Sequence, residues 1–532
     1  MKPMSPATGL AVHRGSDPVR QNRPITYLLY SATTSRSLQK SLGRAEYSYY
    51  FVREKFRAML EKRATVIVVA DPEKEVDAIY DLMRAQGRDC VFLSFCPPHR
   101  MPRTTRCPTV PVFAWEFDSI PDEVWDDDER NDWRTVLARG GQAITHSQYS
   151  AQAIKSAMGS DFHVEAMAAP VWDHYQPPRG NSSKRALDEH AKLELHRAVV
   201  DTRTPSTFMV TASNPLVPRR SFANRLNVTA VYAIAWYRDV VRDLLPLALK
   251  KRISQLGGAL HRFVRKRTVG TRPREHRELV HLELGGMIFL SVFNPWDGRK
   301  NWTEMLTAFC CSLATYPDAT LILKFVHADS SGAMEEVRSI LTRLPPFRCR
   351  VIAIDEFLDD DRYRQLLAAA TFAVNSSLAE GQCLPLMEAM SCGTPVISPR
   401  HTGMREYVDG QVGFVLRSSL ELCCWPHDPR GVLRARRYRG DWQSLVEAYR
   451  DAYRLAKEQP ERYRRMSEVA ASRMQSYCSE QSVYKKLQGF LQQTFARSSP
   501  AMKRGPVSDR PLAAAVCPTR EEQNSVQDRI AL

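Results

Sequence analysis

Short apolar runs alternate with longer helical patterns along two separate stretches of this chain of 532 residues. Alternation of buried strands with helices is typical of a doubly wound, mostly parallel sheet. We therefore expect an α/β fold with two Rossmann-like domains that face a cleft, where a ligand would lie at the carboxyl ends of both sets of strands. In the first stretch the predicted strands lie at 25–30, 65–70, 91–95, 110–117 and 143–147, and the predicted helices at 49–62, 73–85 and 150–158. In the second stretch the predicted strands lie at 287–292, 319–325, 349–354, 372–375 and 395–397, and the predicted helices at 302–315, 334–341, 361–369 and 385–391.

The two stretches divide the chain into a first domain at 25–174 and a second domain at 285–480, with further helical sequence up to 497. The ends, 1–24 and 498–532, are expected to be disordered tails. The first 24 residues lack the apolar core of a signal peptide, and no run approaches the ~20 apolar residues that span a bilayer. We therefore expect a cytoplasmic protein without a transmembrane anchor.

The positive charge of the chain is concentrated between the two domains. The whole chain has 75 Lys and Arg against 59 Asp and Glu, a net charge of +16, and 178–285 carries 21 against 9, or +12. Apolar spacings of three and four predict two short amphipathic helices inside a basic insert at 175–284. The insert, through 225–267, would either bind an anionic membrane surface at the inner face of the membrane or form a helical hairpin with a solvated charged face. Nucleic acid is not an expected partner, because the insert has no helix-turn-helix, RRM or zinc-finger pattern.

The segment 375–405 combines two carboxylates with a helix start. Pro385 suits the first position of a helix, which puts Glu380 and Gly381 in the preceding loop and Glu388 on the second helical turn. Both carboxylates can then face one ligand from different elements. Gly381 permits a close backbone approach, and the N–H groups at the start of the helix can bind an anion such as a diphosphate.

A basic pair follows the first strand of the second domain. Arg299 and Lys300 can neutralise phosphate oxygens and stabilise a departing nucleotide. An isolated Arg-Lys pair is more often solvated surface. Its occurrence together with the Glu380–Glu388 loop and helix, each after a strand of the same predicted sheet, favours a functional site.

These motifs resemble retaining glycosyltransferases of the GT-B architecture, in the large family 4 group that uses nucleotide sugars. The resemblance is strongest over 289–415, where the family's Glu-x7-Glu motif falls on Glu380 and Glu388 and its G-T-P-V-I on 393–397. It implies that Glu380 lies by the donor sugar at the reacting centre and that Glu388 binds the ribose hydroxyls. Lys300 matches the family's phosphate-binding Lys, whereas the expected Arg falls near Pro295, so Arg299 is a substitute. The donor pocket implied by the resemblance further contains Gly381, Leu384, Pro385, His401, Thr402 and Gly403.

The first domain departs from the family pattern. The Gly-rich loop after the first strand is replaced by a segment in which Gly43 is what remains. Where many members have a His after the mid-domain strand, this chain has Trp-Glu-Phe-Asp at 115–118. Glu116 and Asp118 could contact the acceptor or the donor sugar from the cleft side, or they could cap the next turn.

No metal or cofactor is expected. The 12 cysteines include no C-x-x-C and are interpreted as reduced, mostly buried thiols. The acidic triplets 126–128 and 359–361 are interpreted as exposed helix starts, where Asp favours the dipole. Metal independence is also the norm that the resemblance implies, so the nucleotide sugar is a substrate and not a cofactor.

The predicted function is a retaining glycosyltransferase that moves a sugar from a nucleotide-sugar donor to a glycan, lipid-linked or polysaccharide acceptor, as in polysaccharide biosynthesis. The alternative is a binding or scaffold protein on a catalytically degenerate glycosyltransferase fold. The resemblance also implies that the last helix, 481–497, crosses back onto the first domain and ties the two domains together.

Overall fold

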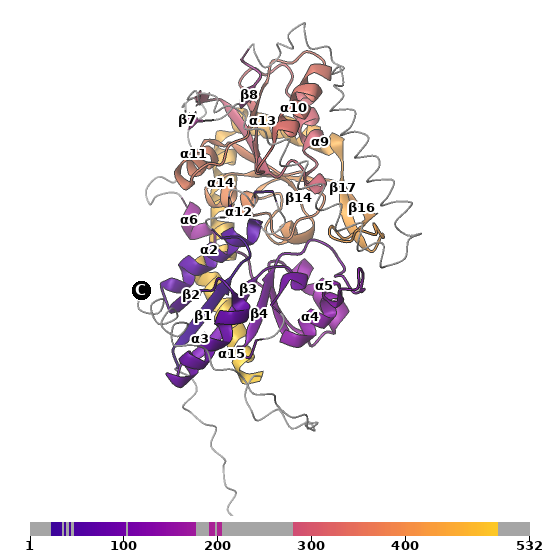
Figure 1. Cartoon of the computed structure of the whole chain (residues 1–532). Helices are drawn as coiled ribbons and strands as arrows, with labels where there is room; N and C mark the ends of the chain where they lie inside the picture. Colours follow the sequence, from indigo (N-terminus) through magenta and orange to yellow (C-terminus); the bar gives the residue numbers. More distant parts are fainter. Residues whose placement is uncertain are drawn as a thin grey trace, which may run out of the picture.

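Two parallel sheets, each flanked by helices, organise the chain, one above the other in Figure 1. This computed structural model describes residues 23–34, 37–38, 42–43, 47–102, 105–176, 191–196, 199–204 and 280–497. The expected tails and the expected amphipathic helices at 225–267 lie outside the described residues. The two α/β domains predicted from the apolar pattern are both present.

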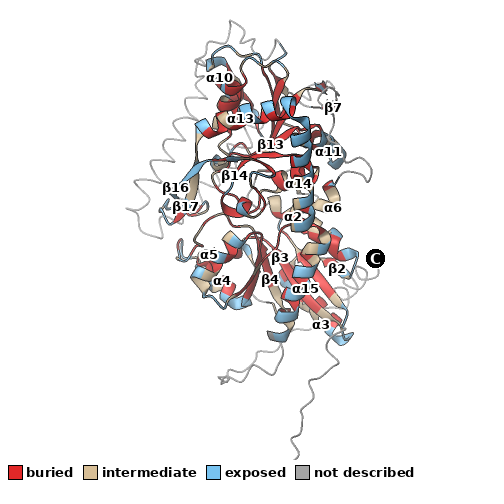
Figure 2. Cartoon of the chain, turned by 180° about the vertical axis from the view of Figure 1, so that it is seen from behind, coloured by how far each residue is buried: buried red, intermediate tan, exposed pale blue. Residues whose placement is uncertain are grey.

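The first sheet has six parallel strands in the order β2-β1-β3-β4-β5-β6. Its central strands are buried on both faces, and Leu28 of β1 lies beside Ile67 of β2 and Phe92 of β3. Helices cover the two faces, so the strands form the buried centre seen in Figure 2. The strands are β1 Ile25–Tyr30, β2 Thr65–Val68, β3 Asp89–Phe95, β4 Thr109–Phe113, β5 Gln142–Thr145 and β6 His163–Ala166. The helices are α2 Tyr47–Glu61, α3 Pro72–Ala85, η2 Pro98–Arg100, η3 Glu129–Asn131, α4 Trp133–Gly140, α5 Gln148–Met158 and α6 Trp172–Tyr175.

The second sheet has seven strands in the order β15-β14-β13-β10-β11-β12-β8, all parallel except β8. Phe289 of the central strand β10 lies beside Leu321 of β11 and Phe372 of β13. The strands are β8 Val199–Asp201, β10 Met287–Phe293, β11 Ala319–Phe325, β12 Arg350–Ile354, β13 Phe372–Val374, β14 Val396–Pro399 and β15 Gly413–Leu416. The helices are η7 Gly298–Lys300, α9 Trp302–Ser312, α10 Ser331–Arg343, α11 Asp360–Ala369, α12 Leu384–Ser391 and η8 Thr402–Glu406.

The described ends of the expected basic insert are strands and not helices. β7 (Ala191–Leu195) pairs antiparallel with β9 (Val280–Leu284), and β8 forms an edge of the second sheet. Arg350 of β12 fixes β8 through two bonds to Asp201, of 3.0 and 2.6 Å. A three-residue antiparallel edge strand carries no β-α alternation, which explains why the pattern did not reveal it. The residues 191–196, 199–204 and 280–284 therefore pack with the second domain.

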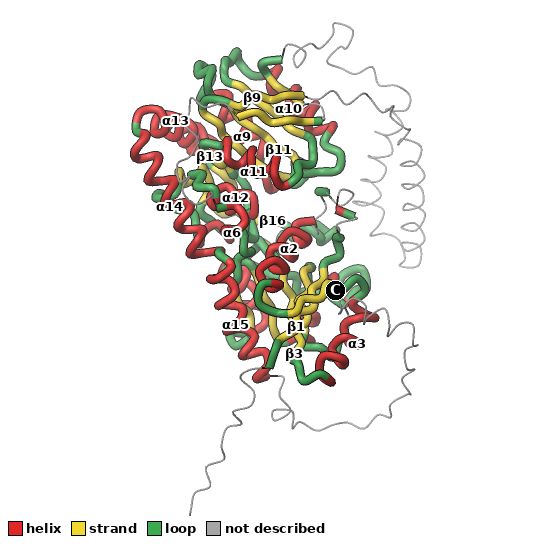
Figure 3. Tube along the Cα trace, turned by 90° about the vertical axis from the view of Figure 1, so that its left-hand side faces the viewer, coloured by secondary structure: helices red, strands yellow, loops and turns green. Residues whose placement is uncertain are grey.

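Three C-terminal helices connect the second domain to the first: α13 Trp442–Glu458, α14 Pro460–Cys478 and α15 Glu480–Arg497. Figure 3 shows them in a column that runs from one domain to the other. On α15, Phe490 stacks on His163 of β6 with ring centroids 4.2 Å apart, and Thr494 donates to Gln142 of β5 at 2.7 Å. The last helix thus packs on the first domain.

A β-hairpin absent from the predicted pattern forms a second connection between the domains. It consists of β16 (Ser418–Cys423) and β17 (Ala435–Gly440), and we refer to 418–440 as the bridging hairpin. Its connecting loop contacts the first-domain segment that follows β4: Trp425 donates to the Ser119 hydroxyl at 3.2 Å, and Arg430 pairs with Glu123 at 2.7 Å. The hairpin lies beside the gap between the domains in Figure 1.

Stacked rings form the centre of this second connection. The His427 ring lies 4.8 Å from His99 and 5.4 Å from Trp133, both nearly parallel to it. Burial lowers the pKa of His427 to about 4 and the pKa of His99 to about 3. Both imidazoles are therefore neutral near pH 7, as an apolar stack requires.

The stacked histidines predict an acid-sensitive contact. An unfolded histidine titrates near pH 6.5, so the stabilisation by His427 is fully present above about pH 6.5 and is lost as the pH falls towards 4. We expect replacement of His427 by Phe to reduce the loss of unfolding free energy between pH 7 and pH 4.5, as measured by urea denaturation. The exposed His281 provides the matched control, because His281→Phe should leave this pH dependence as it is in the wild type. Equal pH dependence in all three proteins would contradict the interpretation.

Candidate functional site

Two loops of the second domain meet at the carboxyl edge of its sheet. One follows β10 and contains η7, and the other follows β13 and leads into α12. Because β10 and β13 are parallel neighbours, both loops emerge at the same edge. Backbone contacts join them: the Leu378 N–H donates to the Arg299 carbonyl at 2.7 Å, and the Ser376 hydroxyl donates to the Lys300 carbonyl at 3.1 Å.

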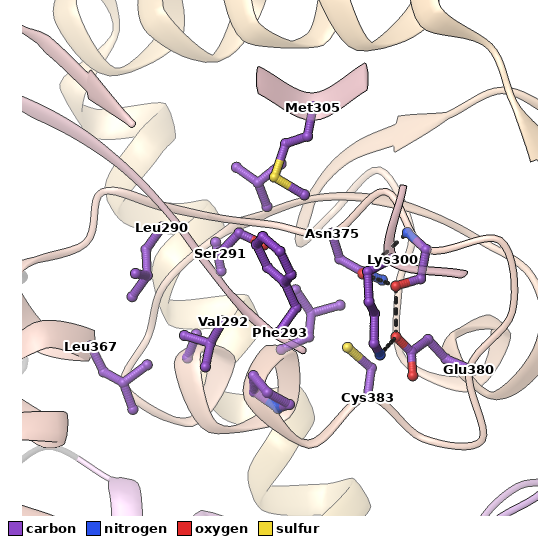
Figure 4. Close-up of a pocket in the computed structure, with 16 residues that line it drawn as sticks. Leu290, Ser291, Val292, Phe293, Lys300, Met305, Leu367, Asn375, Glu380 and Cys383 are labelled. Carbon is purple, nitrogen blue, oxygen red and sulfur yellow. Dashed lines mark hydrogen bonds and ion pairs between the residues drawn. The ribbon is translucent and has the colours of Figure 1, made fainter. Parts of the chain in front are cut away.

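Lys300 and Glu380 form a nearly buried ion pair at this junction (Figure 4). The Lys300 Nζ lies 2.5 Å from Glu380 Oε1, which also accepts a bond of 2.7 Å from the Ser377 hydroxyl. The side chains are 18% and 8% exposed. Burial by itself would lower the pKa of Lys300, but the Glu380 carboxylate beside it raises that pKa above its usual value. The structure thus brings together Lys300 and Glu380, which the sequence predicted to belong to one site.

Arg299 points to a different set of carboxylates. Asp297 holds one edge of the guanidinium with both carboxylate oxygens, at 3.1 Å from Nε and 2.7 Å from Nη2, and Glu116 of the first domain pairs with Nη1. Burial by itself would lower the pKa of Arg299, but these carboxylates raise it. The pKa of Glu116 is raised by burial, although the guanidinium acts against this. Arg299 therefore joins the two domains through a buried charge cluster.

The first-domain candidates lie in a loop and not in a strand. β4 ends at Phe113, so the predicted strand at 110–117 is four residues too long. Glu116 is the counterion of Arg299, and Asp118 accepts from the backbone N–H of Arg436 at 2.8 Å and pairs with its side chain at 2.5 Å. Neither carboxylate caps a turn, so that alternative is wrong. Both instead contact the second domain.

Two glycines allow the Glu380 loop to pass between its neighbours. A Cβ on Gly381 would lie 2.9 Å from the Ala114 Cβ, and a Cβ on Gly403 would lie 2.2 Å from the Gly381 carbonyl oxygen. The Thr402 hydroxyl accepts from the Glu380 N–H at 3.0 Å. Gly381 is thus approached closely on one side by the first-domain segment at Ala114 and on the other side by η8.

Glu388 lies on the second turn of α12, as predicted, and is engaged by aromatic hydroxyls. Tyr363 of α11 donates to its Oε2 at 2.7 Å. Burial raises the pKa of Glu388, while the hydrogen bonds of Tyr363 and Tyr175 and the charge of Lys55 act against this. The Lys55 Nζ lies 4.8 Å from the centre of the Tyr175 ring. Groups from both domains therefore surround Glu388.

The cavity in Figure 4 is small, with about 30 Å³ open to the centres of water-sized molecules, and lies at the start of α12. Lys300, Glu380 and Pro385 line it, whereas Leu384 and Glu388 do not. The polar or charged residues that line it are Ser291, Lys300, Asn375, Ser377 and Glu380. A cation, a carboxylate and a helix start at one cavity can bind an anionic group beside a polyhydroxylated one.

His401 lines a separate space of only about 10 Å³ together with Ser376 and Arg417. Its ring stacks on Tyr438 of the bridging hairpin at 4.3 Å. Burial lowers the pKa of His401 to about 4, so the ring is neutral near pH 7. His401 is near Glu380 through Thr402, but it lines a different cavity.

Gly43 lies against the second domain. Its carbonyl accepts from Asn294 in the loop after β10 at 2.9 Å, and an added Cβ would overlap the His327 ring. What remains of the expected Gly-rich loop therefore lies beside the loop that carries Arg299 and Lys300.

Among the described residues, no group of three or more His, Cys, Asp or Glu side chains could hold a metal ion. Asp359 caps α11 by accepting from the Arg362 N–H at 2.9 Å, as predicted for a helix start. Asp128 likewise caps η3, but Asp126 and Asp127 have positive φ angles and form a turn, so the helix-start interpretation fails for these two. In the part of the chain that the structure describes, no helix is long and apolar enough to cross a membrane.

Sequence reasoning missed the partners of the candidates and not the candidates themselves. Asp297, Tyr363 and Tyr438 have no motif, and each becomes part of the site only when distant segments pack together. The one local signal was at Asp297, which stands two residues before Arg299 and caps η7.

Comparison with known proteins supports the motif assignment. A family model described as glycosyl transferases group 1 matches residues 287–423, which include Lys300, Glu380 and Glu388. This segment of the second domain is similar to the group 1 glycosyl transferases. The resemblance predicted over 289–415 is thereby confirmed.

The individual proteins that this chain resembles are distant from it. The α-maltose-1-phosphate synthase of Mycolicibacterium smegmatis is 34% identical over 101 residues, which cover 19% of this chain and 26% of that protein. The chain thus matches about a quarter of the length of this relative. HepE of Anabaena, solved with UDP and glucose, is 13% identical with a TM-score of 0.44, and the match covers 88% of this chain and 100% of that one. Sucrose-phosphate synthase from Thermosynechococcus elongatus is 12% identical with a TM-score of 0.46, covering 89% and 100%.

The Lys300–Glu380 pair predicts an asymmetric effect on stability. Removing one partner of a buried pair leaves an uncompensated charge, and for a pair with this residual exposure we expect Lys300→Ala to cost about 2–3 kcal/mol of unfolding free energy. The double variant Lys300→Ala/Glu380→Gln should regain more than half of this loss, because no charge is then left unpaired. Urea denaturation at pH 7 measures both. A double variant as unstable as the single one would show that the ion pair is not what Lys300 contributes.

Proposed function

We propose that the chain is a retaining glycosyltransferase that moves a sugar from a nucleotide-sugar donor to an acceptor hydroxyl. The observation that carries the proposal is Lys300 beside Glu380 at the start of α12, within the segment that is similar to the group 1 glycosyl transferases. The positive charge suits the diphosphate of a donor, and the carboxylate suits the hydroxyls of its sugar. A glycan, lipid-linked or polysaccharide acceptor would enter between the domains.

In the proposed reaction the bond between the sugar C1 and the diphosphate oxygen breaks, and the acceptor oxygen bonds to C1 on the same face. The acceptor proton passes to the departing diphosphate oxygen. Lys300 stabilises the negative charge that develops on the leaving group. Arg299 adds a second positive charge once the diphosphate replaces Glu116 as its partner, and the Asp297 carboxylate keeps the guanidinium oriented meanwhile.

Glu388 is proposed to bind the ribose hydroxyls of the donor. Its carboxylate now accepts from Tyr363, so the ribose would share this oxygen or displace the phenol. The remaining candidates of the donor pocket would position the Glu380 loop: Thr402 holds its backbone, and Gly381 and Gly403 allow its close packing.

A nucleotide-binding scaffold without catalysis is the second candidate. One observation favours it: Arg299, Lys300 and Glu388 all have partners within the chain. A panel of UDP-, ADP- and GDP-sugars, assayed for nucleotide release, separates the two candidates. Release that disappears in Lys300→Ala supports the transferase. Binding of a nucleotide sugar without release, under conditions that include candidate acceptors, supports the scaffold.

Glu388 allows a test of the donor orientation. We expect Glu388→Ala to weaken binding of the preferred nucleoside diphosphate by at least about tenfold, since a hydrogen bond to a charged group contributes about 1.5–3 kcal/mol. The rate of nucleotide release at saturating donor should change much less. Tyr363→Phe is the matched control, because it removes the hydroxyl that donates to Glu388 and keeps the Glu388 carboxylate. Unchanged nucleotide affinity in Glu388→Ala, measured by calorimetry, would refute the ribose assignment.

Glu116 competes with the diphosphate for Arg299, and this gives a prediction with a defined sign. Glu116→Gln should tighten binding of UDP, ADP or GDP several-fold, whereas Asp297→Asn should weaken it because Arg299 loses its orientation. Burial raises the pKa of Glu116, so acidification protonates this carboxylate and should tighten binding in the wild type more than in Glu116→Gln. Calorimetric titrations between pH 8 and pH 5.5 give the pH dependence of nucleotide affinity for the wild type and for Glu116→Gln. Protonation of the nucleotide itself affects both proteins equally, so it drops out of the comparison. Weaker binding in Glu116→Gln would mean that Glu116 helps the donor.

A further inference from the structure

Lys55 of α2 is a half-buried cation whose partner is an aromatic ring and not a carboxylate. Its ammonium lies 4.8 Å from the centre of the Tyr175 ring, and among the described residues it has no hydrogen bond and no ion pair. Burial lowers the pKa of Lys55, and the carboxylates of Glu388 and Asp360 act against this. A cation kept partly out of water without a counterion is costly, so Lys55 is a candidate for a ligand contact.

The carboxylates near Lys55 differ in whether they have a cation of their own. Asp360 pairs with Arg364 at 2.9 Å. Glu388 accepts from the Tyr363 hydroxyl at 2.7 Å, and no cation of the described residues lies within ion-pair distance of it. Lys55 and Glu388 are therefore two opposite charges at one interface, and each lacks a direct partner of opposite sign.

One face of α2 is turned towards Glu388. Tyr47, Phe51 and Lys55 recur at intervals of four residues and so share this face, and the Tyr47 and Phe51 rings lie 5.0 Å apart. Burial and the Glu388 carboxylate both raise the pKa of Tyr47. Figures 1 and 3 both show α2 beside α6, the helix that carries Tyr175. Side chains of the first domain thus approach the Glu388 carboxylate of α12.

Tyr175 connects Lys55 to Glu388. Its ring faces the ammonium, and burial together with the Glu388 carboxylate raises the pKa of its hydroxyl. The contact of an ammonium with an aromatic ring is weaker than a charge-assisted hydrogen bond to a phosphate oxygen. Tyr175 therefore keeps the ammonium near Glu388 and leaves it available to an anion.

The proposed donor carries an anion at the required distance. With the ribose on Glu388, the α-phosphate lies towards the start of α12, where free N–H groups favour negative charge. Glu388 follows Leu384, the first residue of α12, by four positions, so the rise of the helix puts its start about 6 Å away. The flexible four-carbon stem of Lys55, already one ring away from Glu388, can span this distance.

We propose that Lys55 is a donor-binding residue supplied by the first domain, and that its ammonium binds the α-phosphate of the nucleotide whose ribose is bound by Glu388. This inference rests on the proposed function, because it needs the donor in that orientation. Lys55 and Glu388 come from different domains, so one nucleotide would hold the two domains together at this point. Arg299 and Lys300 then remain for the β-phosphate, whose oxygen carries the charge that develops as the bond to the sugar breaks.

A nucleoside and its phosphates test the assignment by displacement calorimetry. The base is that of the diphosphate, UDP, ADP or GDP, that the wild type binds most tightly. The gain in affinity from the nucleoside to its monophosphate isolates the α-phosphate. We expect Lys55→Met to reduce this gain about tenfold and to leave nucleoside affinity as in the wild type, since a hydrogen bond between charged groups contributes about one factor of ten or more. Lys55→Arg keeps the positive charge and should retain most of the gain.

Lys74→Met is the matched control, because it removes a cation from α3 of the same domain that is 82% exposed. Its gain should equal that of the wild type. An equal loss for nucleoside and monophosphate in Lys55→Met would show that Lys55 only supports Glu388 through Tyr175, and it would overturn the proposal. An unchanged gain in Lys55→Met, with tight binding of the diphosphate, would overturn it as well and leave the proposed function standing. A wild type that binds none of the three diphosphates would refute the proposed function and the phosphate assignment together.

Discussion

Five charged side chains, between 8% and 24% exposed at the junction of the domains, determine how the rest of the structure can be arranged. Arg299 and Lys300 stand among Asp297, Glu116 and Glu380, in surroundings where an unpaired charge is very costly. Each cation fixes a different loop: Lys300 fixes the loop after β13, and Arg299 fixes the loop that follows β4 in the other domain. The relative position of the two domains is therefore fixed by these ion pairs as well as by the C-terminal helices.

The same cluster shapes the chemistry that the site can perform. Three carboxylates against two cations leave a net negative charge, which repels a diphosphate until one carboxylate is protonated or moves away. Glu116 is the natural one to move, because it comes from the other domain, whereas Asp297 and Glu380 belong to the loops that carry the cations. Ligand binding and the relation between the domains are thus linked through a single side chain.

The sequence was sufficient to predict the two α/β domains and the positions of Lys300, Glu380 and Glu388, because strand alternation and the Glu-x7-Glu motif are local patterns. It was insufficient for β8, which is three residues long and antiparallel, and for the bridging hairpin, in which β16 has only two leucines and β17 has none. The roles of Glu116 and Asp118 were left open for a different reason. Their partners, Arg299 and Arg436, lie 183 and 318 residues away along the chain, and only folding shows which cation each carboxylate meets.

The stack of His427 with His99 and Trp133 has a kinetic consequence. With the C-terminal helices crossing between the domains and the hairpin forming a second crossing, the chain closes a ring around the region where donor and acceptor would meet. A ring of this kind cannot open about one hinge unless one crossing dissociates, and the helices are the larger of the two. Exchange of a bulky ligand would then require His427 to leave His99 and Trp133, and the Arg299–Glu116 pair to break, so its rate would depend partly on a ring contact that lies outside the candidate site.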